Sequence, residues 1–247
     1  MRILRKPTGG LGRILVLTLA LVGWQLTCSP AFAELANDQA VFIDFTGTEC
    51  GIVSAETMEV VSTFPCDRYS EGIDVTSDGT RAVIGNCYYD TLTLVDLVSD
   101  PPAVIDQIDS AVRCVQELDI APDDSFAIAT GSRDGLTSKF TLDPFEVLPG
   151  NPAGPWDPNA FIGGNPQDVH INSDGTVAVQ PTYRGDFFAK LDVTGDVPVL
   201  LEKIPTPANP VDPASALSHH GISLSQYDDD TFVATGRPCC FTLPSVR

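Results

Sequence analysis

Polar side chains recur at two matched positions of a repeated segment. The first position directly precedes a short apolar strand and is occupied by Glu71, Gln116, Gln167 and His220, with Asp168 and His219 beside it. The second position lies inside the same strand and is occupied by Asp74, Asp119, His170 and Ser223. Carboxylates and imidazoles that converge around one axis could bind a divalent cation or polarise a carbonyl group. All three histidines of the chain belong to this set, which makes it the first place to look for a binding site.

A structural explanation competes with the binding site. Repeat proteins place polar residues at equivalent sites for packing reasons alone, so these side chains could instead cap strand starts and hydrogen-bond neighbouring repeats. The sequence contains no G-x-S-x-G, G-x-G-x-x-G or phosphate-binding loop. Ser218 and His219 are sequence neighbours, and neighbours on a strand point to opposite faces, so they do not make a dyad. No catalytic residue and no cofactor is therefore predicted, and a divalent cation stays one of the two explanations.

The segment at 71–97 is the clearest copy of the repeat that must position these residues. Its sequence, EGIDVTSDGTRAVIGNCYYDTLTLVDL, predicts short strands at 72–75, 81–85 and 91–97 from its apolar and alternating runs. Asp78-Gly79 between the first two runs is a strong hairpin signal, because both residues tolerate positive φ. An outer strand is expected at 103–108.

The same hairpin recurs without gaps further along the chain. Ile73, Leu118 and Val169 each stand five residues before an Asp and nine before an Ala. The three acids are Asp78, Asp123 and Asp174, and we expect each to form a turn through bonds to its own backbone. Successive repeats are 45, 51 and 53 residues apart, and no helical periodicity accompanies them. A period of this length with three or four strands per unit predicts an all-β fold, a β-propeller.

The expected propeller domain covers residues 34–247. Its blade units are expected near 39–66, 71–114, 117–165, 166–217 and 218–247, which makes about four to five units. Pro- and Gly-rich stretches at 144–158 and 205–213 are predicted loop insertions, the first of them anchored by Trp156, and the acids at 228–230 are expected in a solvated turn. Either the last hairpin joins the first strands in one composite blade, or the propeller is incomplete or truncated.

One family resemblance is carried by the first repeat. The residues VTSDGTRAVIGN, followed by TLTLVDL, resemble the YVTN-type β-propeller repeat, with its S-x-D-G turn, its small apolar strand ending in Asn and its strand ending in Val-Asp-Leu. The match is good at 72–97, fair at 168–193 and partial at 118–142. The resemblance implies a propeller and leaves the activity open, because surface-layer proteins, lactonase-like propellers and extracytoplasmic binding proteins share this repeat.

The blade order predicts how the cysteines pair. Six cysteines lie after residue 33: Cys50, Cys66, Cys87, Cys114, Cys239 and Cys240. An even number in an exported chain predicts disulfides, and the absence of C-x-x-C disfavours zinc. Successive strands of a blade alternate in direction. The loop between the second and third strands of a blade and the connection to the next blade therefore lie on the same rim of the propeller. That rim brings together Cys50 with Cys66 and Cys87 with Cys114, while Cys239 and Cys240 either bridge each other or await another partner.

The first 33 residues have the organisation of a secretory signal peptide. Arg2, Arg5, Lys6 and Arg13 precede or begin an apolar run at 14–24, and a small-x-small end at 31–33 predicts cleavage before Glu34. A lipoprotein site at Cys28 is the weaker alternative, because small residues are missing before it. The apolar run is too short to span a bilayer comfortably, so no stable membrane insertion is expected after cleavage.

The charge balance narrows the class of partner. The formal net charge is −19, and the leader holds four of the fourteen Lys and Arg residues and no acid. An acidic surface repels phosphate backbones, which argues against nucleic acid. We expect a secreted, periplasmic or cell-surface protein that meets a protein, a glycan or a small molecule at its loop rim. The alternative is a lactonase-like hydrolase in which His170, His220 and either nearby acids or Arg184 polarise a ring ester, an interpretation that comes largely from the family resemblance.

Overall fold

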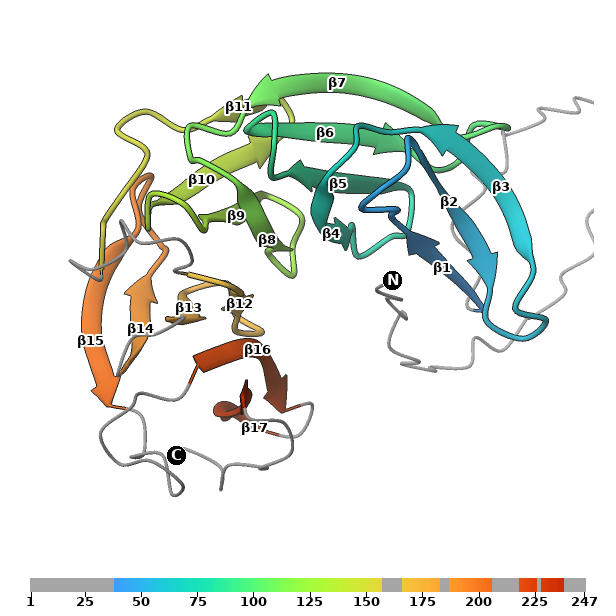
Figure 1. The fold of residues 1–247 in the computed structure, drawn as a ribbon. Helices are drawn as coiled ribbons and strands as arrows, with labels where there is room; N and C mark the ends of the chain where they lie inside the picture. The colour runs from blue at the N-terminus through green and yellow to red at the C-terminus, as the bar shows by residue number, and fades with distance from the viewer. Residues whose placement is uncertain (1–37, 157–165, 183–186, 206–217, 226–227, 238–247) are drawn as a thin grey trace, which may run out of the picture.

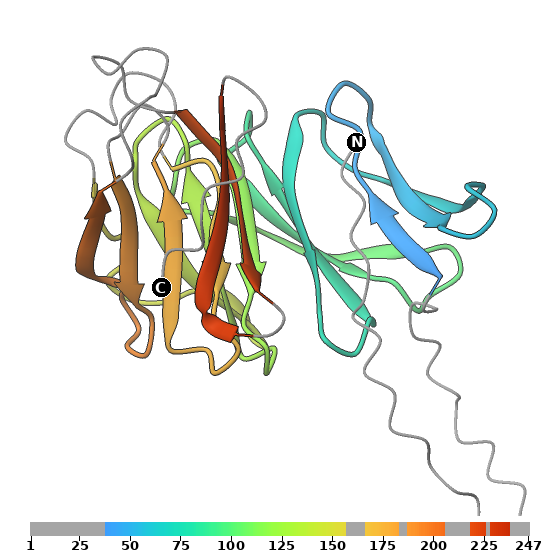
Figure 2. The same cartoon turned by 90° about the horizontal axis from the view of Figure 1, so that it is seen from below.

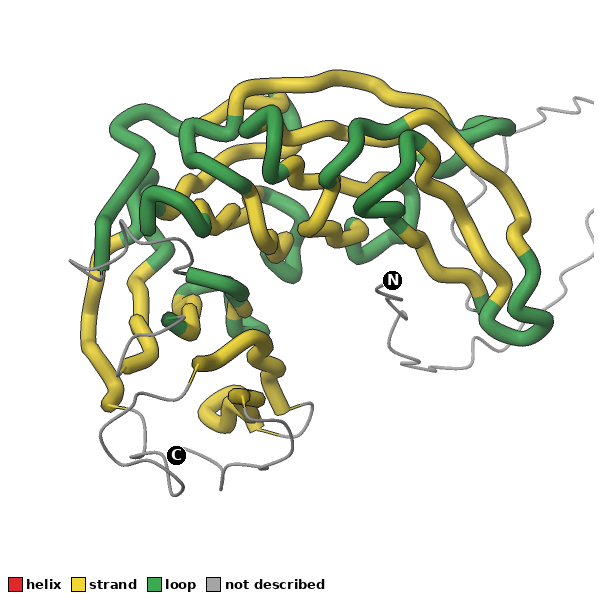
Figure 3. Tube along the Cα trace, in the orientation of Figure 1, coloured by secondary structure: helices red, strands yellow, loops and turns green. Residues whose placement is uncertain are grey.

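The structure is a computed structural model that describes residues 38–156, 166–182, 187–205, 218–225 and 228–237. These residues form seventeen β-strands and no helix, as the tube in Figure 3 shows. Among them there is accordingly no helix with the length and apolar character needed to cross a membrane. The predicted signal peptide, Arg184, Cys239 and Cys240 lie outside the described residues.

The strands form successive antiparallel sheets in chain order. The first sheet contains β1 (Gln39–Phe42), β2 (Glu49–Ser54) and β3 (Val60–Pro65). The second contains β4 (Ser70–Val75), β5 (Arg81–Asn86), β6 (Thr91–Asp96) and β7 (Ala103–Asp109). The third contains β8 (Val115–Ile120), β9 (Phe126–Gly131), β10 (Thr137–Leu142) and β11 (Phe145–Val147).

The later sheets repeat this order. The fourth contains β12 (His170–Ile171), β13 (Val177–Pro181), β14 (Phe187–Asp192) and β15 (Val199–Pro205). The last pair is β16 (Ser218–Ser225) with β17 (Asp228–Arg237). Strands β4, β8, β12 and β16 line the inside of an arc, and β3, β7 and β15 form its outside (Figure 1). Seen from below, the sheets stand side by side (Figure 2). The predicted all-β propeller is confirmed, and its described blades form an open arc.

Three apolar cores lie between neighbouring blades rather than inside any one of them. The first joins the sheets of β1–β3 and β4–β7 through Val41, Phe64, Ile73 and Ile84. The second joins β4–β7 to β8–β11 and includes Phe140, which is fully buried. The third joins β8–β11 to β12–β15 around Ile128 and Leu191. The sheets β4–β7 and β8–β11 each contribute to two of these cores, so a four-stranded unit depends on its neighbours for stability.

The turn acids behave as the sequence predicts. Each accepts a hydrogen bond from the backbone N–H two residues later: Thr80 to Asp78 (2.9 Å), Ser125 to Asp123 (3.1 Å) and Thr176 to Asp174 (3.0 Å). The hydroxyl groups of the same three partners also donate to these carboxylates. Such bonds close the tight turn and fix the register of each hairpin.

Two local expectations were wrong. The stretch at 144–158 contains a short strand, β11, because Phe145 and Val147 alternate and pair with β10, where the ring of Phe145 lies 5.9 Å from that of Phe140. Asp228, expected in a turn, begins β17 and pairs with Ser225. Trp156 does anchor its loop, since its indole N–H donates to Thr137 Oγ1 (3.2 Å) and its ring packs against the third core.

Candidate functional site

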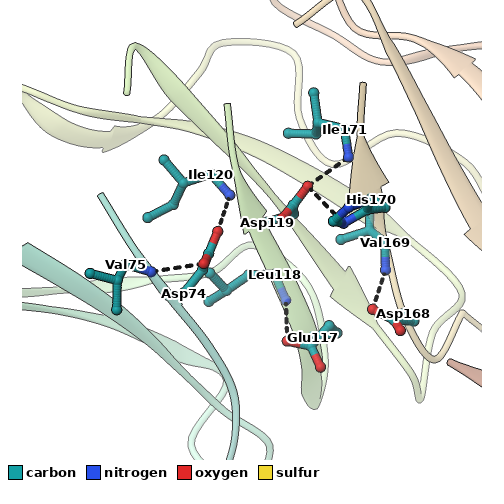
Figure 4. Close-up of polar contacts among 10 residues, drawn as sticks. All are labelled: Asp74, Val75, Glu117, Leu118, Asp119, Ile120, Asp168, Val169, His170 and Ile171. Atoms are coloured by element: carbon teal, nitrogen blue, oxygen red, sulfur yellow. Dashed lines mark hydrogen bonds and ion pairs between the residues drawn. The ribbon is translucent and has the colours of Figure 1, made fainter. Parts of the chain in front are cut away.

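Aspartates on the inner strands connect each blade to the next. Asp74 on β4 accepts one hydrogen bond from the N–H of Val75 (2.8 Å) and another from the N–H of Ile120 in the next blade (2.8 Å). Asp119 on β8 stands at the equivalent position and accepts the N–H of Ile171 (2.6 Å), again one blade further (Figure 4). Asp74 and Asp119, two of the four residues predicted at this position, therefore form an inter-blade ladder, as the structural explanation of the matched set expects.

His170, the third residue at this matched position, contacts the ladder at Asp119. Its Nδ1 lies 3.4 Å from Asp119 Oδ2, the same oxygen that accepts the Ile171 N–H. Burial acts to lower the pKa of His170, but the hydrogen bond with Asp119 and the charges of Asp119, Asp168 and Asp74 outweigh it, so the pKa lies above its ordinary value. The protonated form is therefore more favoured than in a free imidazole, and an imidazolium can donate a hydrogen bond to an oxygen and polarise it.

Two buried carboxylates flank the ladder, at the position before Leu118 and its equivalent. Glu117 accepts the N–H of Leu118 (3.3 Å), and Asp168 accepts the N–H of Val169 (2.8 Å), as drawn in Figure 4. The backbone N–H of Gln167 donates to the carbonyl of Pro181 (3.4 Å). Each acid accepts the N–H of the following residue, Asp168 just before β12 and Glu117 inside β8, so both have a structural role.

For the two histidines of β16, the structure describes the position of the backbone. His219 pairs with Gly236 in the β16–β17 ladder, and His220 lies next to it in the same strand. Both are thus brought to the inner side of the arc, beside β12 (Figure 1).

Glu71 meets a different set of groups. One ligand atom each from Glu71, Cys87 and Cys114 lies within 4.8 Å of the other two. Burial raises the pKa of the Glu71 carboxyl, although the charge of Arg133 and a hydrogen bond with Gln116 act in the opposite direction. In the described part of the chain this is the one set of three metal-ligand side chains that lie so close together.

Two disulfides tie the loop rim. Cys50 bonds Cys66 and Cys87 bonds Cys114, the two pairs that the blade order predicts. The first closes a span of 16 residues and the second a span of 27. Disulfides form and persist in oxidising compartments, which fits a location outside the cytoplasm.

The same rim presents a cluster of aromatic side chains that the sequence analysis did not single out. Phe45, Tyr69, Tyr88 and Tyr89 form a continuous row of ring contacts, with centroids 5.2, 5.3 and 5.1 Å apart. We call these four residues the aromatic row. Three of them are substantially exposed: Phe45 by 45%, Tyr88 by 59% and Tyr89 by 54%. The signal that could have revealed it is Tyr88-Tyr89 directly after Cys87, two large aromatic residues in a predicted loop.

Backbone and side-chain amides hold the aromatic row in place. Tyr69 N–H donates to Phe45 O and Cys87 N–H donates to Tyr69 O, both at 2.9 Å. The Asn86 side-chain oxygen accepts the N–H groups of Tyr88 (2.9 Å) and Tyr89 (2.7 Å). The row is therefore built where β1 and β5 end and β4 begins, and these bonds hold its rings in position for a partner.

Comparisons with known proteins identify the class and no more. The fold is similar to that of Kuenenia stuttgartiensis hydrazine synthase, with a TM-score of 0.67 and 17% sequence identity over 81% of this chain and 53% of that one. It is also similar to the dihydro-heme d1 dehydrogenase NirN in complex with DHE, with a TM-score of 0.62 and 14% identity over 88% of this chain and 45% of that one. Both have β-propeller-type folds.

The chain spans about half the length of these two solved structures. No protein-family model matches the sequence, and a search of curated proteins finds no match either. At such low identity the likeness concerns the fold alone. The protein is a β-propeller with disulfide-tied blades.

Proposed function

We propose that the chain is an exported propeller of the YVTN type that binds a partner through its disulfide-tied loop rim. The partner is a protein, a glycan or a small molecule. The aromatic row is the observation that carries the proposal. Solvent-exposed aromatic rings that touch one another without being covered are a common feature of interaction surfaces, because they bury large areas at little cost in side-chain entropy.

The surroundings of the aromatic row support binding over catalysis. The guanidinium of Arg68 lies 5.5 Å from the centre of the Tyr69 ring, so the row also offers hydrogen-bond donors beside its apolar faces. The inner-strand acids, by contrast, already accept backbone N–H groups from the next blade. Loops on a rigid scaffold commonly carry recognition, and this rim has both the rigidity and the exposed rings.

The experiment compares two doubly substituted proteins. Purified wild-type protein is screened against panels of glycans and extended peptides, together with Tyr88→Ser/Tyr89→Ser and, as the control, Val104→Ser/Ile105→Ser. Val104 and Ile105 are exposed by 45% and 53% but lie on the outer strand β7. We expect a bound class that the tyrosine variant loses by about tenfold or more and that the control retains. Equal binding by both variants, or no bound class at all, would count against the proposal.

The lactonase-like alternative has one supporting observation, the contact of His170 with Asp119. Turnover of a lactone panel by wild-type protein, lost in both His170→Ala and His220→Ala, would favour it. Absence of turnover in wild-type protein would leave the binding function as the better account. The raised pKa of His170 favours its protonated form, which can polarise a carbonyl oxygen.

A further inference from the structure

We propose that Glu71, Cys87 and Cys114 form a zinc site in the reduced protein. Oxidation of the two thiols to the Cys87–Cys114 disulfide removes two of the three ligands and abolishes the site. The site is independent of the partner-binding function proposed above. Its ligands come from the start of β4, the loop after β5 and the connection before β8, so only the folded propeller brings them together.

The positions of the ligand atoms suit zinc. The three atoms lie within 4.8 Å of one another while the sulfurs are bonded. In a tetrahedral site with Zn–S bonds of about 2.3 Å, two thiolate sulfurs lie about 3.8 Å apart, and a carboxylate oxygen lies slightly closer to each of them. After the S–S bond is reduced, the two sulfurs therefore need to move apart by less than about 2 Å to bind the metal. Two soft thiolates with one carboxylate favour Zn²⁺ over Mg²⁺ or Ca²⁺.

One oxygen of Glu71 has no protein partner. Oε2 is buried and makes no hydrogen bond within the described residues, while Gln116 hydrogen-bonds the carboxylate. A buried acceptor without a donor keeps the cost of its lost hydration. A cation between this oxygen and the two sulfurs would remove that cost, which makes Oε2 the natural third ligand.

The surroundings of the two sulfurs resemble those of a metal ligand. Both cysteines are buried, Cys87 exposed by 7% and Cys114 by 3%. The hydroxyl of buried Ser132 donates to Cys114 Sγ at 3.0 Å, and Asp90 Oδ1 accepts the Cys114 N–H at 2.7 Å. Donors to a thiolate stabilise its charge and orient it, as outer-shell groups do around metals. Three protein ligands leave the fourth tetrahedral position to water, so the metal can exchange.

The conversion between the two states balances as thiol–disulfide exchange. A dithiol reductant attacks one sulfur to form a mixed disulfide, and its second thiol then displaces the protein thiol. The reductant becomes a cyclic disulfide, and two electrons and two protons pass to Cys87 and Cys114. Zinc then replaces the two thiol protons, which pass to water. An oxidising disulfide reverses the sequence and expels the metal.

The test uses the full chain, kept reduced under anaerobic conditions and titrated with Co²⁺ as a spectroscopic substitute for zinc. We expect a near-ultraviolet sulfur-to-cobalt charge-transfer band that saturates at one metal per chain and is removed by added Zn²⁺. Air-oxidised protein, with its disulfides mapped by mass spectrometry, should show no such band. Far-UV circular dichroism of each sample reports whether the strands persist.

Three variants make the assignment specific. Cys87→Ser/Cys114→Ser should lose the band, whereas Cys50→Ser/Cys66→Ser should keep it, because within the described chain Cys50 and Cys66 have no third ligand nearby. Glu71→Gln should lower the affinity for the metal by about tenfold or more. A reduced protein that binds no cobalt, whether folded or not, would refute the site. So would equal cobalt binding by wild type and Glu71→Gln, or a band that persists without Cys87 and Cys114.

Discussion

Asp74 and Asp119 perform the same task one blade apart. Each uses a carboxylate oxygen to accept a backbone N–H from the inner strand of the following blade. Those N–H groups belong to Ile120 and Ile171, both buried and both at the end of an inner strand. A buried donor that loses its acceptor costs about 1–3 kcal/mol, so these side chains contribute to stability even though they resemble ligands in the sequence.

The first prediction compares Asp74→Ala with Asp106→Ala. Both aspartates accept the N–H of the next residue at 2.8 Å, but only Asp74 also accepts a bond from the next blade. We expect Asp74→Ala to lower the free energy of unfolding by about 1–3 kcal/mol and Asp106→Ala to lower it by less than about 0.5 kcal/mol. Urea denaturation measures both. Equal losses would show that the inter-blade bond contributes nothing.

A second prediction concerns pH. The pKa of His170 lies above its unfolded value of about 6.5, chiefly because the bond to Asp119 and the nearby charges of Asp168 and Asp74 outweigh burial. A raised pKa contributes stability that is fully present below about pH 6.5 and is lost as the pH rises through the folded value. We therefore expect His170→Gln to cost about 1 kcal/mol at about pH 5.5 and less at about pH 8.5. Denaturation of both proteins at the two pH values provides the measurement, and a pH-independent difference would contradict it.

At the scale of elements, the inner strands of neighbouring blades approach closely at their starts. A Cβ built on Gly72 would lie 2.9 Å from Cα of Glu117, closer than real side chains come to backbone. The third prediction is that Gly72→Ala separates β4 from β8 and costs about 1–3 kcal/mol. Gly195→Ala is the control, since its nearest neighbour, Val197 O, is 3.9 Å away. Thermal unfolding of the two variants should differ, and similar midpoints would show that the strands have room.

The fourth prediction concerns the disulfides. In the chain-entropy model, closing spans of 16 and 27 residues stabilises the fold by about 3 and about 3.5 kcal/mol. We expect Cys50→Ser/Cys66→Ser and Cys87→Ser/Cys114→Ser each to cost about that much, with the second pair costing slightly more. Guanidinium unfolding of both proteins measures the losses. A much smaller loss for the longer span would indicate that the unfolded chain is already constrained there.

Much of the element order could be predicted from the sequence because its signals are local. An Asp-centred turn every 45 to 53 residues fixes a hairpin, and the hairpins at Asp78, Asp123 and Asp174 formed as expected. The direction of strands then fixed which cysteines share a rim. Strand β11 was missed because its run of three residues is too short for an alternating pattern to stand out, although Asp143-Pro144 before it forms the turn.

The site was less predictable, for a physical reason. Matched polar positions show that side chains recur, but not whether they face a ligand or the backbone of the next blade. Only the offset between β4 and β8 places Asp74 against the Ile120 N–H. Likewise, Tyr69 contacts both Phe45 and Tyr88 only because three loops meet at one rim, and these partners lie 24 and 19 positions from it in the chain.

At the scale of the whole molecule, the net negative charge destabilises the folded state. The formal net charge is −19, and like charges on one folded surface repel one another. The fifth prediction is that raising NaCl from about 0.02 M to about 0.3 M raises the melting temperature by a few degrees, because added ions shorten the range of that repulsion. Differential scanning calorimetry gives the value, with choline chloride as a second salt to separate ionic strength from sodium binding. A melting temperature that falls with salt would indicate that attractive pairs dominate.

The aspartate ladder has a consequence for how such a chain can change in length. Asp74 and Asp119 occupy equivalent positions and bond equivalent N–H groups, so the β4–β7 and β8–β11 blades each present the following blade with the same acceptor. A tandem duplication of either of these two blades would insert a new rung without leaving an old one unmatched, and loss of the β8–β11 blade would let Asp74 meet the partner that Asp119 has now. Blade number is thus open to change by whole-unit gene duplication or deletion, with no compensating substitution at the junction.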